Sequence, residues 1–377
     1  MILMGEKLRI FAGLMIGLSM LLSTVGSVSI FDPDDGVYIE AIALDAVDGR
    51  DIVLAYSMLY PAANTIYLVR VHNGSVGSHE PIYQLQHEQT VSSRNGLFVG
   101  ARGDEYRVLI VLDEPAEPSG FTSTQTIVVI KQNGDGVWST ASHLIGLSCC
   151  TRVLSFAVGG DGTSYTLIQQ SGRLTLITEA NGDFARTHIA NSSPMGHVSV
   201  DQDGQPHVCY SDLGKVIDWS PAGSHVLYER NRVESFDCNF IVTRADLKWG
   251  VFAALPKVGG SCLTPLPCLS PPDSGKLIVF SQDGQETSIV ATNLSYWTTP
   301  QLSESPMGRR LIMNYYPTSE SFKNTILEFR DDGLVEVARA PTWSWLPRSN
   351  IIEPVVLHEV YGQDGYEARL VRIPDSR

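Results

Sequence analysis

The sequence predicts an all-β protein built from repeated hairpins, and three observations lead to this fold class. Apolar and polar residues alternate with a period of two in many short segments, as expected for strands with one buried face. Asp-Gly pairs separate several of these segments, and both residues tolerate the backbone angles of tight hairpin turns. The 377 residues include 33 glycines and 20 prolines, which favour many turns over long helices.

Residues 198–212, VSVDQDGQPHVCYSD, contain the clearest hairpin. Apolar and polar residues alternate on both sides of an Asp203-Gly204 corner, so this segment is predicted to fold as strand, turn and strand. The upstream segment SFAVGGDGTSYTLIQQ aligns with it without gaps and places Asp161-Gly162 on the same corner. The alignment also places Tyr165 on His207, so this position is expected to hold a packed side chain of aromatic size.

Five further segments repeat the unit in other parts of the chain. AIALDAVDGRDIVLAYS turns at Asp48-Gly49 with one extra residue, and FVGARGDEYRVLIVLDE turns at Gly103-Asp104 with the pair reversed. CNFIVTRADLKWGVFAAL, from Cys238, and QLSESPMGRRLIMNYYP, from Gln301, keep both strands but replace the turn. The last copy, PVVLHEVYGQDGYEARLVRIP, turns at Asp364-Gly365.

The spacing of these seven copies, about 40 to 60 residues, leaves room for a second hairpin after each one. Such hairpins are visible in GRLTLITEANGDFARTHI and KVIDWSPAGSHVLYE. Four short strands per period predict a single β-propeller of six or seven four-stranded blades over residues 28–377, with seven favoured. The last copy has room for two strands only. N-terminal strands near residues 28–31 and 37–44 are therefore expected to complete that blade and remove an exposed edge.

The unit V-D-x-D-G-x-P-H-V-x-Y, from Val200 to Tyr210, resembles a repeat of secreted sialidase-like propellers, often written A-V-D-x-D-G-x-P-H-V-A-Y. The resemblance implies a propeller, and many such propellers are non-catalytic. A catalytic sialidase would carry three carboxylate-binding arginines, a tyrosine nucleophile and an early Arg-Ile-Pro signature. Here Arg372-Ile373-Pro374 occurs in the last predicted strand, and turns of the type Ser-x-Asp-x-Gly-x-Thr-Trp are absent. The prediction is a non-catalytic member.

The first 27 residues have the pattern of a secretory signal peptide. Lys7 and Arg9 precede an uncharged apolar run over residues 10–30, and small residues near its end provide a cleavage site. The run is also long enough for the alternative, an uncleaved membrane anchor. In both cases residues 28–377 are expected to be secreted, periplasmic or on the cell surface.

An oxidising compartment favours disulfides for the six cysteines. Cys262 and Cys268 would close a short loop, and Cys209 and Cys238 lie in successive repeat units and would join neighbouring blades. Six cysteines allow fifteen pairings, so the connectivity stays open. Candidate glycosylation sites in Asn-x-Ser triplets are Asn73, Asn191 and Asn293.

The composition and motifs exclude several classes of function. The net charge of −14 and the lack of lysine and arginine clusters argue against nucleic acid as a partner. Histidine spacing does not fit a zinc site, and a calcium loop does not continue after Asp201 and Asp203. Nucleophile elbows, phosphate loops and dinucleotide fingerprints are also missing from the sequence, so no metal or cofactor is expected.

Three residues are candidates for ligand binding. Asp201 follows a predicted strand and would line the mouth of a central channel, while Trp343 and Trp345 would share one strand face and stack on sugar rings. The sequence thus predicts an exported, non-catalytic binding or scaffolding module with a protein or carbohydrate ligand at one face. The alternative is a carbohydrate-active hydrolase or lyase whose acids come from different blades.

Overall fold

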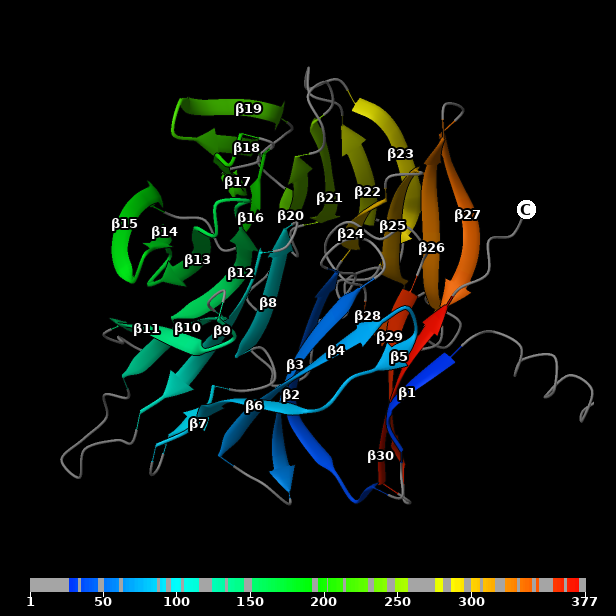
Figure 1. The fold of residues 1–377 in the computed structure, drawn as a ribbon. Coiled ribbons are helices and arrows are strands. Elements are labelled where there is room, and N and C mark those ends of the chain that lie inside the picture. Colours follow the sequence, from blue (N-terminus) through cyan, green and yellow to red (C-terminus); the bar gives the residue numbers. More distant parts are fainter. Residues whose placement is uncertain are drawn as a thin grey trace, which may run out of the picture.

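The computed structural model describes the backbone from Ser27 to Arg372, with gaps in loops, the longest at residues 115–123, 257–274 and 346–354. Side chains are described mainly between Ser27 and Glu229, and again at residues 357–359 and 366–371. Among the described residues, 30 strands form seven antiparallel sheets, lettered A to G (Figure 1). A search of the same residues finds no helix with the length and apolar character needed to span a membrane. The all-β prediction is confirmed.

Sheets B and C follow the first strand of the chain. Sheet B consists of β2 (Tyr38–Ala46), β3 (Ile52–Tyr60), β4 (Thr65–His72) and a split outer edge of β5 (Ser75–Val76) and β6 (Glu80–Gln84). Sheet C consists of β7 (Thr90–Val91), β8 (Leu97–Arg102), β9 (Glu105–Asp113), β10 (Gln125–Gln132) and β11 (Trp138–Ile145). Both β7 and β8 pair with β9.

Sheets D to G each contain four strands that pair in chain order. Sheet D consists of β12 (Arg152–Val158), β13 (Ser164–Gln170), β14 (Arg173–Ala180) and β15 (Asp183–Ala190). Sheet E consists of β16 (Gly196–Val200), β17 (Pro206–Asp212), β18 (Lys215–Ser220) and β19 (Gly223–Glu229). Sheet F consists of β20 (Glu234–Val242), β21 (Lys248–Pro256), β22 (Gly275–Phe280) and β23 (Glu286–Leu294). Sheet G consists of β24 (Pro300–Ser305), β25 (Gly308–Tyr315), β26 (Lys323–Arg330) and β27 (Gly333–Ala340).

Sheet A combines strands from both ends of the described chain. It consists of β28 (Ser344–Trp345), β29 (Val355–Gly362), β30 (Gly365–Arg372) and β1 (Ser27–Phe31). The outer strand β1 pairs with β30 in antiparallel register, with Ser27 opposite Val371 and Val28 opposite Leu370. The N-terminal strand is therefore held by the C-terminal one.

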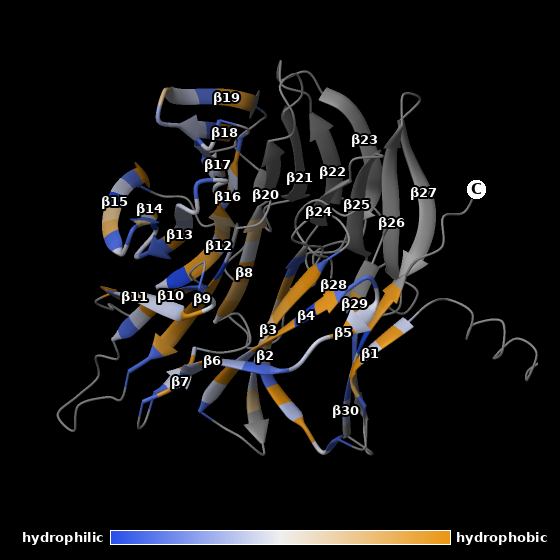
Figure 2. Ribbon diagram, viewed as in Figure 1, coloured by the Kyte–Doolittle hydropathy of each residue, from blue (hydrophilic) through white to orange (hydrophobic). Residues whose placement is uncertain are grey.

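The first strands of successive sheets lie against one another. β2 contacts β8, β8 contacts β12, β12 contacts β16, β16 contacts β20, and β20 contacts β24. Figure 1 shows these strands toward the middle of the molecule, with last strands such as β15, β19 and β27 toward the outside. In Figure 2 hydrophobic residues gather on inner strands such as β3 and β8. The arrangement is propeller-like.

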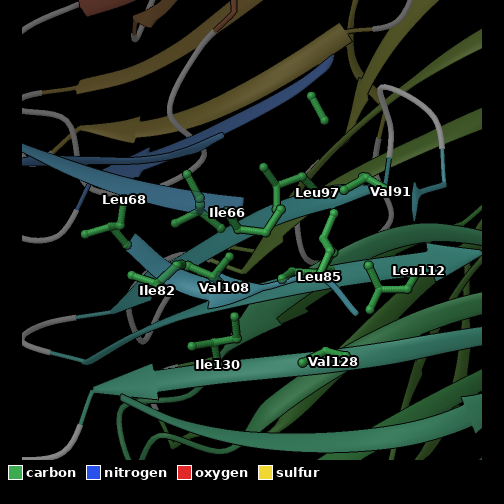
Figure 3. Close-up of a cluster of buried hydrophobic side chains, with 14 of the residues drawn as sticks. Ile66, Leu68, Ile82, Leu85, Val91, Leu97, Val108, Leu112, Val128 and Ile130 are labelled. Atoms are coloured by element: carbon green, nitrogen blue, oxygen red, sulfur yellow. The ribbon is translucent and has the colours of Figure 1, made fainter. Parts of the chain in front are cut away.

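Apolar side chains fill the seams between neighbouring sheets. Figure 3 shows the cluster between sheets B and C, where Ile66 and Leu68 of β4 lie near Val108 of β9. Similar clusters join sheets A and B, sheets C and D, and sheets D and E. Each fully buried valine, leucine or isoleucine contributes about 1.5–3 kcal/mol through removal from water. This burial explains why the alternating segments pack face to face as separate sheets.

Two of the predicted Asp-Gly corners, those of sheets D and E, form as the sequence predicts, while the corners at residues 48–49, 103–104 and 363–364 lie outside the described residues. In sheet D, Gly162 N–H donates to Gly159 O at 3.0 Å and Gly159 N–H donates to Thr163 O at 2.8 Å. In sheet E the matching bonds run from Gly204 N–H to Asp201 O at 3.2 Å and from Asp201 N–H to Gln205 O at 3.0 Å. Gly162 and Gly204 have φ angles of +80° and +79°, which glycine adopts without strain.

Two expectations about the chain ends need correction. Residues 37–44 do not complete the last sheet, because β2 pairs with β3 and opens sheet B. The last hairpin copy forms β29 and β30, the second and third strands of sheet A after β28, whereas the copies in sheets B, D, E, F and G supply the first and second strands. The described residues begin at Ser27, so residues 1–26 of the predicted signal peptide lie outside them. The signal peptide stays a prediction.

Candidate functional site

A layer of buried polar side chains lies just beneath the corners between the first and second strands of sheets B to E. Its members are 3–8% exposed and lie one or two pairs from the corner of their hairpins: Asp45, Arg107, Tyr165 and His207. Tyr165 pairs with Ala157 and His207 pairs with Ser199, in each case one pair before the corner. We call these four residues the polar layer.

Members of the polar layer connect each sheet to the next one. Asp45 Oδ2 on β2 accepts a hydrogen bond of 2.9 Å from the Ala101 N–H on β8. Tyr165 on β13 donates through its hydroxyl to Gly204 O, in the corner of sheet E, at 3.2 Å. Sheets B and C, and sheets D and E, are thus joined by polar contacts as well as by apolar seams.

Arg107 of sheet C acts on the corner of sheet D through its charge. The pKa of Asp161 is lowered mainly by the Thr163 backbone N–H, and the positive charge of Arg107 lowers it further. Burial raises the pKa of Tyr165, and the charges of Asp161 and Asp201 raise it further, so its hydroxyl stays protonated as the donor to Gly204. The polar layer therefore stabilises the corners of sheets D and E, through the hydrogen bond of Tyr165 and the charge of Arg107.

His207 lies between two carboxylates of its own sheet. Its Nδ1 is 3.1 Å from both carboxylate oxygens of Asp218, and its Nε2 is 3.4 Å from Asp201 Oδ2. The side chains of His207 and Asp218 are 7% and 2% exposed, whereas Asp201 is 22% exposed. An N–H at Nδ1 donates to Asp218, which orients the ring so that Nε2 faces the more exposed carboxylate.

Asp201 lies directly after β16, at the strand end where the sequence predicted it. Its Oδ1 accepts the Gln205 N–H at 2.8 Å, so one carboxylate oxygen holds the corner and the other faces His207. His207 is buried, as expected for a packed residue, but it is also hydrogen-bonded. The structure therefore groups Asp201 with His207, Asp218 and the neighbouring Tyr165.

The other predicted binding residues are not brought to this site. Trp345 belongs to β28 without a described side chain, and Trp343 lies outside the described residues. Asn73 is exposed at the turn between β4 and β5 with a φ of +48°, and Asn191 is exposed after β15. Asn293 lies in β23 without a described side chain. The glycosylation assignments stay predictions.

Cys209 on β17 is fully buried and takes part in a disulfide bond. Strand β17 lies against β20, which contains Cys238, but the Cys238 side chain is not described. The pairing of these two cysteines therefore stays a prediction. Cys262 and Cys268 lie outside the described residues. In the part of the chain that is described, no group of three or more histidine, cysteine or acidic residues could hold a metal ion.

Sequence reasoning missed Asp45 and Asp218 as members of the site. Each is the one carboxylate of a short apolar segment, ALDA or VIDW, and a buried charge in such a segment requires partners. A lone carboxylate in an apolar segment was therefore the sequence pattern that could have identified both residues. Arg107 had no comparable signal, because an arginine next to a turn is common at a protein surface.

Comparisons with known proteins support a propeller-like fold and leave the family unassigned. No family model matches the sequence, and no curated protein matches it. The solved structure of a polysaccharide lyase of family PL25, an ulvan lyase, aligns with 89% of this chain and 95% of its own at 10% identity, with a TM-score of 0.53. Virginiamycin B lyase from Staphylococcus aureus aligns with 92% of this chain and 98% of its own, at 10% identity and a TM-score of 0.49. The likeness to the ulvan lyase concerns the fold alone.

Proposed function

We propose that the protein is an exported, non-catalytic β-propeller that binds a protein or carbohydrate ligand at its corner face, the face formed by residues 159–163 and 201–205. The observation that carries the proposal is the polar layer. Asp45 and Tyr165 of this layer, and the adjacent Asp201, make hydrogen bonds to backbone groups of the corners and inner strands. Corners held in this way form a rigid surface, and a rigid surface loses little entropy when a ligand binds.

We further propose that the seven sheets are the blades of one closed ring. The pairing of β1 with β30 supports closure, and so does the cluster that joins sheet A to sheet B. In that cluster the Phe31 ring lies 4.9 Å from Tyr56 of sheet B and 6.0 Å from Tyr366 of sheet A. Closure through a terminal strand removes the free edges that would otherwise pair with other chains.

A glycan array on the purified exported chain tests the binding function. Asp203 is an exposed carboxylate in a corner, and Asp203→Asn removes its charge while preserving a turn, because Asn-Gly suits tight turns as well as Asp-Gly does. Asp183→Asn is the matched control, since Asp183 is also exposed but lies at the start of the outer strand β15. Changed binding of Asp203→Asn with unchanged binding of Asp183→Asn supports the corner face. Turnover of any glycan rejects the non-catalytic role.

One observation favours a second candidate, a carbohydrate lyase or hydrolase. A histidine oriented by a buried carboxylate, with its other nitrogen toward a more exposed group, is the arrangement of a general base. His207 and Asp218 have this arrangement. Incubation with a panel of polysaccharides, followed by detection of reducing ends and of unsaturated products, tests it. Turnover that falls by about 100-fold or more in a folded His207→Gln variant supports the enzyme. Absence of turnover by the unmodified protein rejects it.

A further inference from the structure

An exposed arginine on the corner face is held in a fixed orientation by neutral groups. Arg70 lies near the end of β4, and its Nη2 donates to the Tyr106 hydroxyl on β9 and to Gln132 Oε1 on β10. The guanidinium also lies over the Tyr106 ring, with its central carbon 5.3 Å from the ring centroid. Three contacts from a neighbouring sheet therefore fix a side chain that normally moves freely at a surface.

The charge of Arg70 has no counter-ion in the part of the chain that the structure describes. Its hydrogen-bond partners among the described residues are a phenol and an amide, and neither neutralises a guanidinium. This is unusual in a chain with a formal net charge of −14, where carboxylates outnumber cations by 41 to 27. Both hydrogen bonds use Nη2, so among the described residues the donors on Nη1 and Nε are left for another acceptor. Each of these donors can make a charge-assisted hydrogen bond to a carboxylate oxygen. The carboxylate would be held by single bonds and not by a fork, because Cδ lies between Nη1 and Nε.

Aromatic surface lies beside this arginine. The Tyr106 ring packs edge-on against Trp138 at a centroid distance of 6.3 Å, and the Trp138 indole N–H donates to Glu80 Oε1 at 2.7 Å. Val137, the residue before Trp138, is 58% exposed. Half-buried aromatic rings with fixed orientation, next to planar polar groups, suit the apolar faces and hydroxyl groups of a sugar ring.

We propose that Arg70, Tyr106 and Trp138 form a subsite for an acidic sugar, with Arg70 binding the sugar carboxylate and the aromatic pair contacting its ring. This inference rests on the proposed ligand face and specifies the ligand class that the face takes. The subsite lies at the seam of sheets B and C, where the ends of β4 and β10 meet the start of β9 and β11. A ligand that extends from it toward the Asp-Gly corners would contact several blades.

The test compares an oligomer of galacturonic acid with its fully methyl-esterified form by titration calorimetry on the full exported chain. The ester has nearly the same size and hydroxyl groups but lacks the charge. Arg70→Gln is expected to weaken binding of the acidic oligomer by about tenfold or more, because charged hydrogen bonds are the strong class. Arg70→Gln is expected to leave binding of the ester within about twofold, since an uncharged ester gains little from the guanidinium.

Two further variants separate a binding role from a structural one. Arg186→Gln is the matched control, because Arg186 is also an exposed arginine held by neutral groups, His143 and Leu144 O, but it lies on the outer strand β15. Its affinity should equal that of the unmodified protein. Tyr106→Phe keeps the charge and removes one bond that orients Arg70, so we expect a loss of about threefold to fivefold.

Equal binding of acid and ester by the unmodified protein, or equal effects of the two arginine variants, overturns the subsite. No binding of the acidic oligomer also overturns it. None of these results decides the proposed binding function. That function is tested separately, by whether Asp203→Asn changes the binding of any ligand on the glycan array.

Discussion

Ser155 and Ser199 allow the polar contacts between sheets to be measured with two small changes. The Val198 N–H on β16 donates to Ser155 Oγ on β12 at 2.7 Å, and this bond links the inner strands of sheets D and E. Ser155 and Val198 are 0% and 1% exposed. Ser199 Oγ is also buried, one residue further along β16, but it has no hydrogen-bond partner among the described residues.

Ser155→Ala and Ser199→Ala each remove one hydroxyl, but we expect them to change the free energy of unfolding by different amounts. Ser155→Ala leaves the Val198 N–H buried without an acceptor, which costs about 1–3 kcal/mol. We expect a loss of about 2 kcal/mol in the free energy of unfolding, since almost no volume is removed and cavity effects are small. Ser199→Ala removes a polar atom that gains nothing from burial, so its effect should lie between zero and about 1 kcal/mol of stabilisation.

Equilibrium unfolding in urea, followed by tryptophan fluorescence and by circular dichroism, measures both values. Coincident curves from the two probes check that unfolding occurs in a single step. The reasoning is refuted if the two alanine variants agree within about 0.5 kcal/mol, or if Ser199→Ala is the more destabilised, because the bond between inner strands would then contribute nothing measurable.

Three other expectations concern different seams. Gly100→Ala should destabilise the seam of sheets C and D by about 1–3 kcal/mol in the same urea assay, because an added Cβ would lie 2.8 Å from Val158 Cγ2. Burial and the charge of Arg186 lower the pKa of His143, so the folded protein favours the neutral imidazole. The contribution of this group to the free energy of unfolding is therefore complete above the ordinary histidine pKa, about 6.5, and is lost as the pH falls below that value. Urea unfolding between pH 7.5 and 5 should show a smaller loss in His143→Gln than in the unmodified protein, and equal losses would contradict this cause. Reduction of the Cys209 disulfide should lower stability by about 2–5 kcal/mol, measured with and without dithiothreitol, and an unchanged midpoint would show that this bond supports little of the fold.

The hairpins were predictable because their signals are local. Asp161-Gly162 and Asp203-Gly204 place residues that tolerate a positive φ between alternating segments, and a short turn brings those segments together with little loss of entropy. The gapless alignment of Tyr165 with His207 was also correct, because both corners have the same length and both residues lie one pair before the corner.

The polar layer could not be predicted from the same alignment. Sheet C makes its corner from the pair Arg102 and Glu105, whereas sheets D and E use longer connections, and Arg107 lies two pairs from its corner whereas His207 lies one pair from its own. Asp45 lies one pair from its corner, but on a first strand and not on a second one. Contacts that depend on register and on the neighbouring sheet leave no fixed spacing in the sequence.

The proposed acidic-sugar subsite was equally hidden. Arg70 is separated from Tyr106 by 36 positions and from Gln132 by 62, so its partners come from the next sheet. An isolated arginine in a strand usually indicates a solvated face. Only the packing of sheet B on sheet C shows that this side chain is fixed by neutral groups.

The pairing of β1 with β30 has a consequence for biosynthesis. The ribosome makes β1 before every other described strand and makes its only partner in the sheet after all of the others. A nascent chain that emerges in this order holds an unpaired strand until β30 has been made, whereas the middle sheets can assemble as they appear. Chaperone dependence should therefore be most sensitive to changes in the hairpin of β29 and β30.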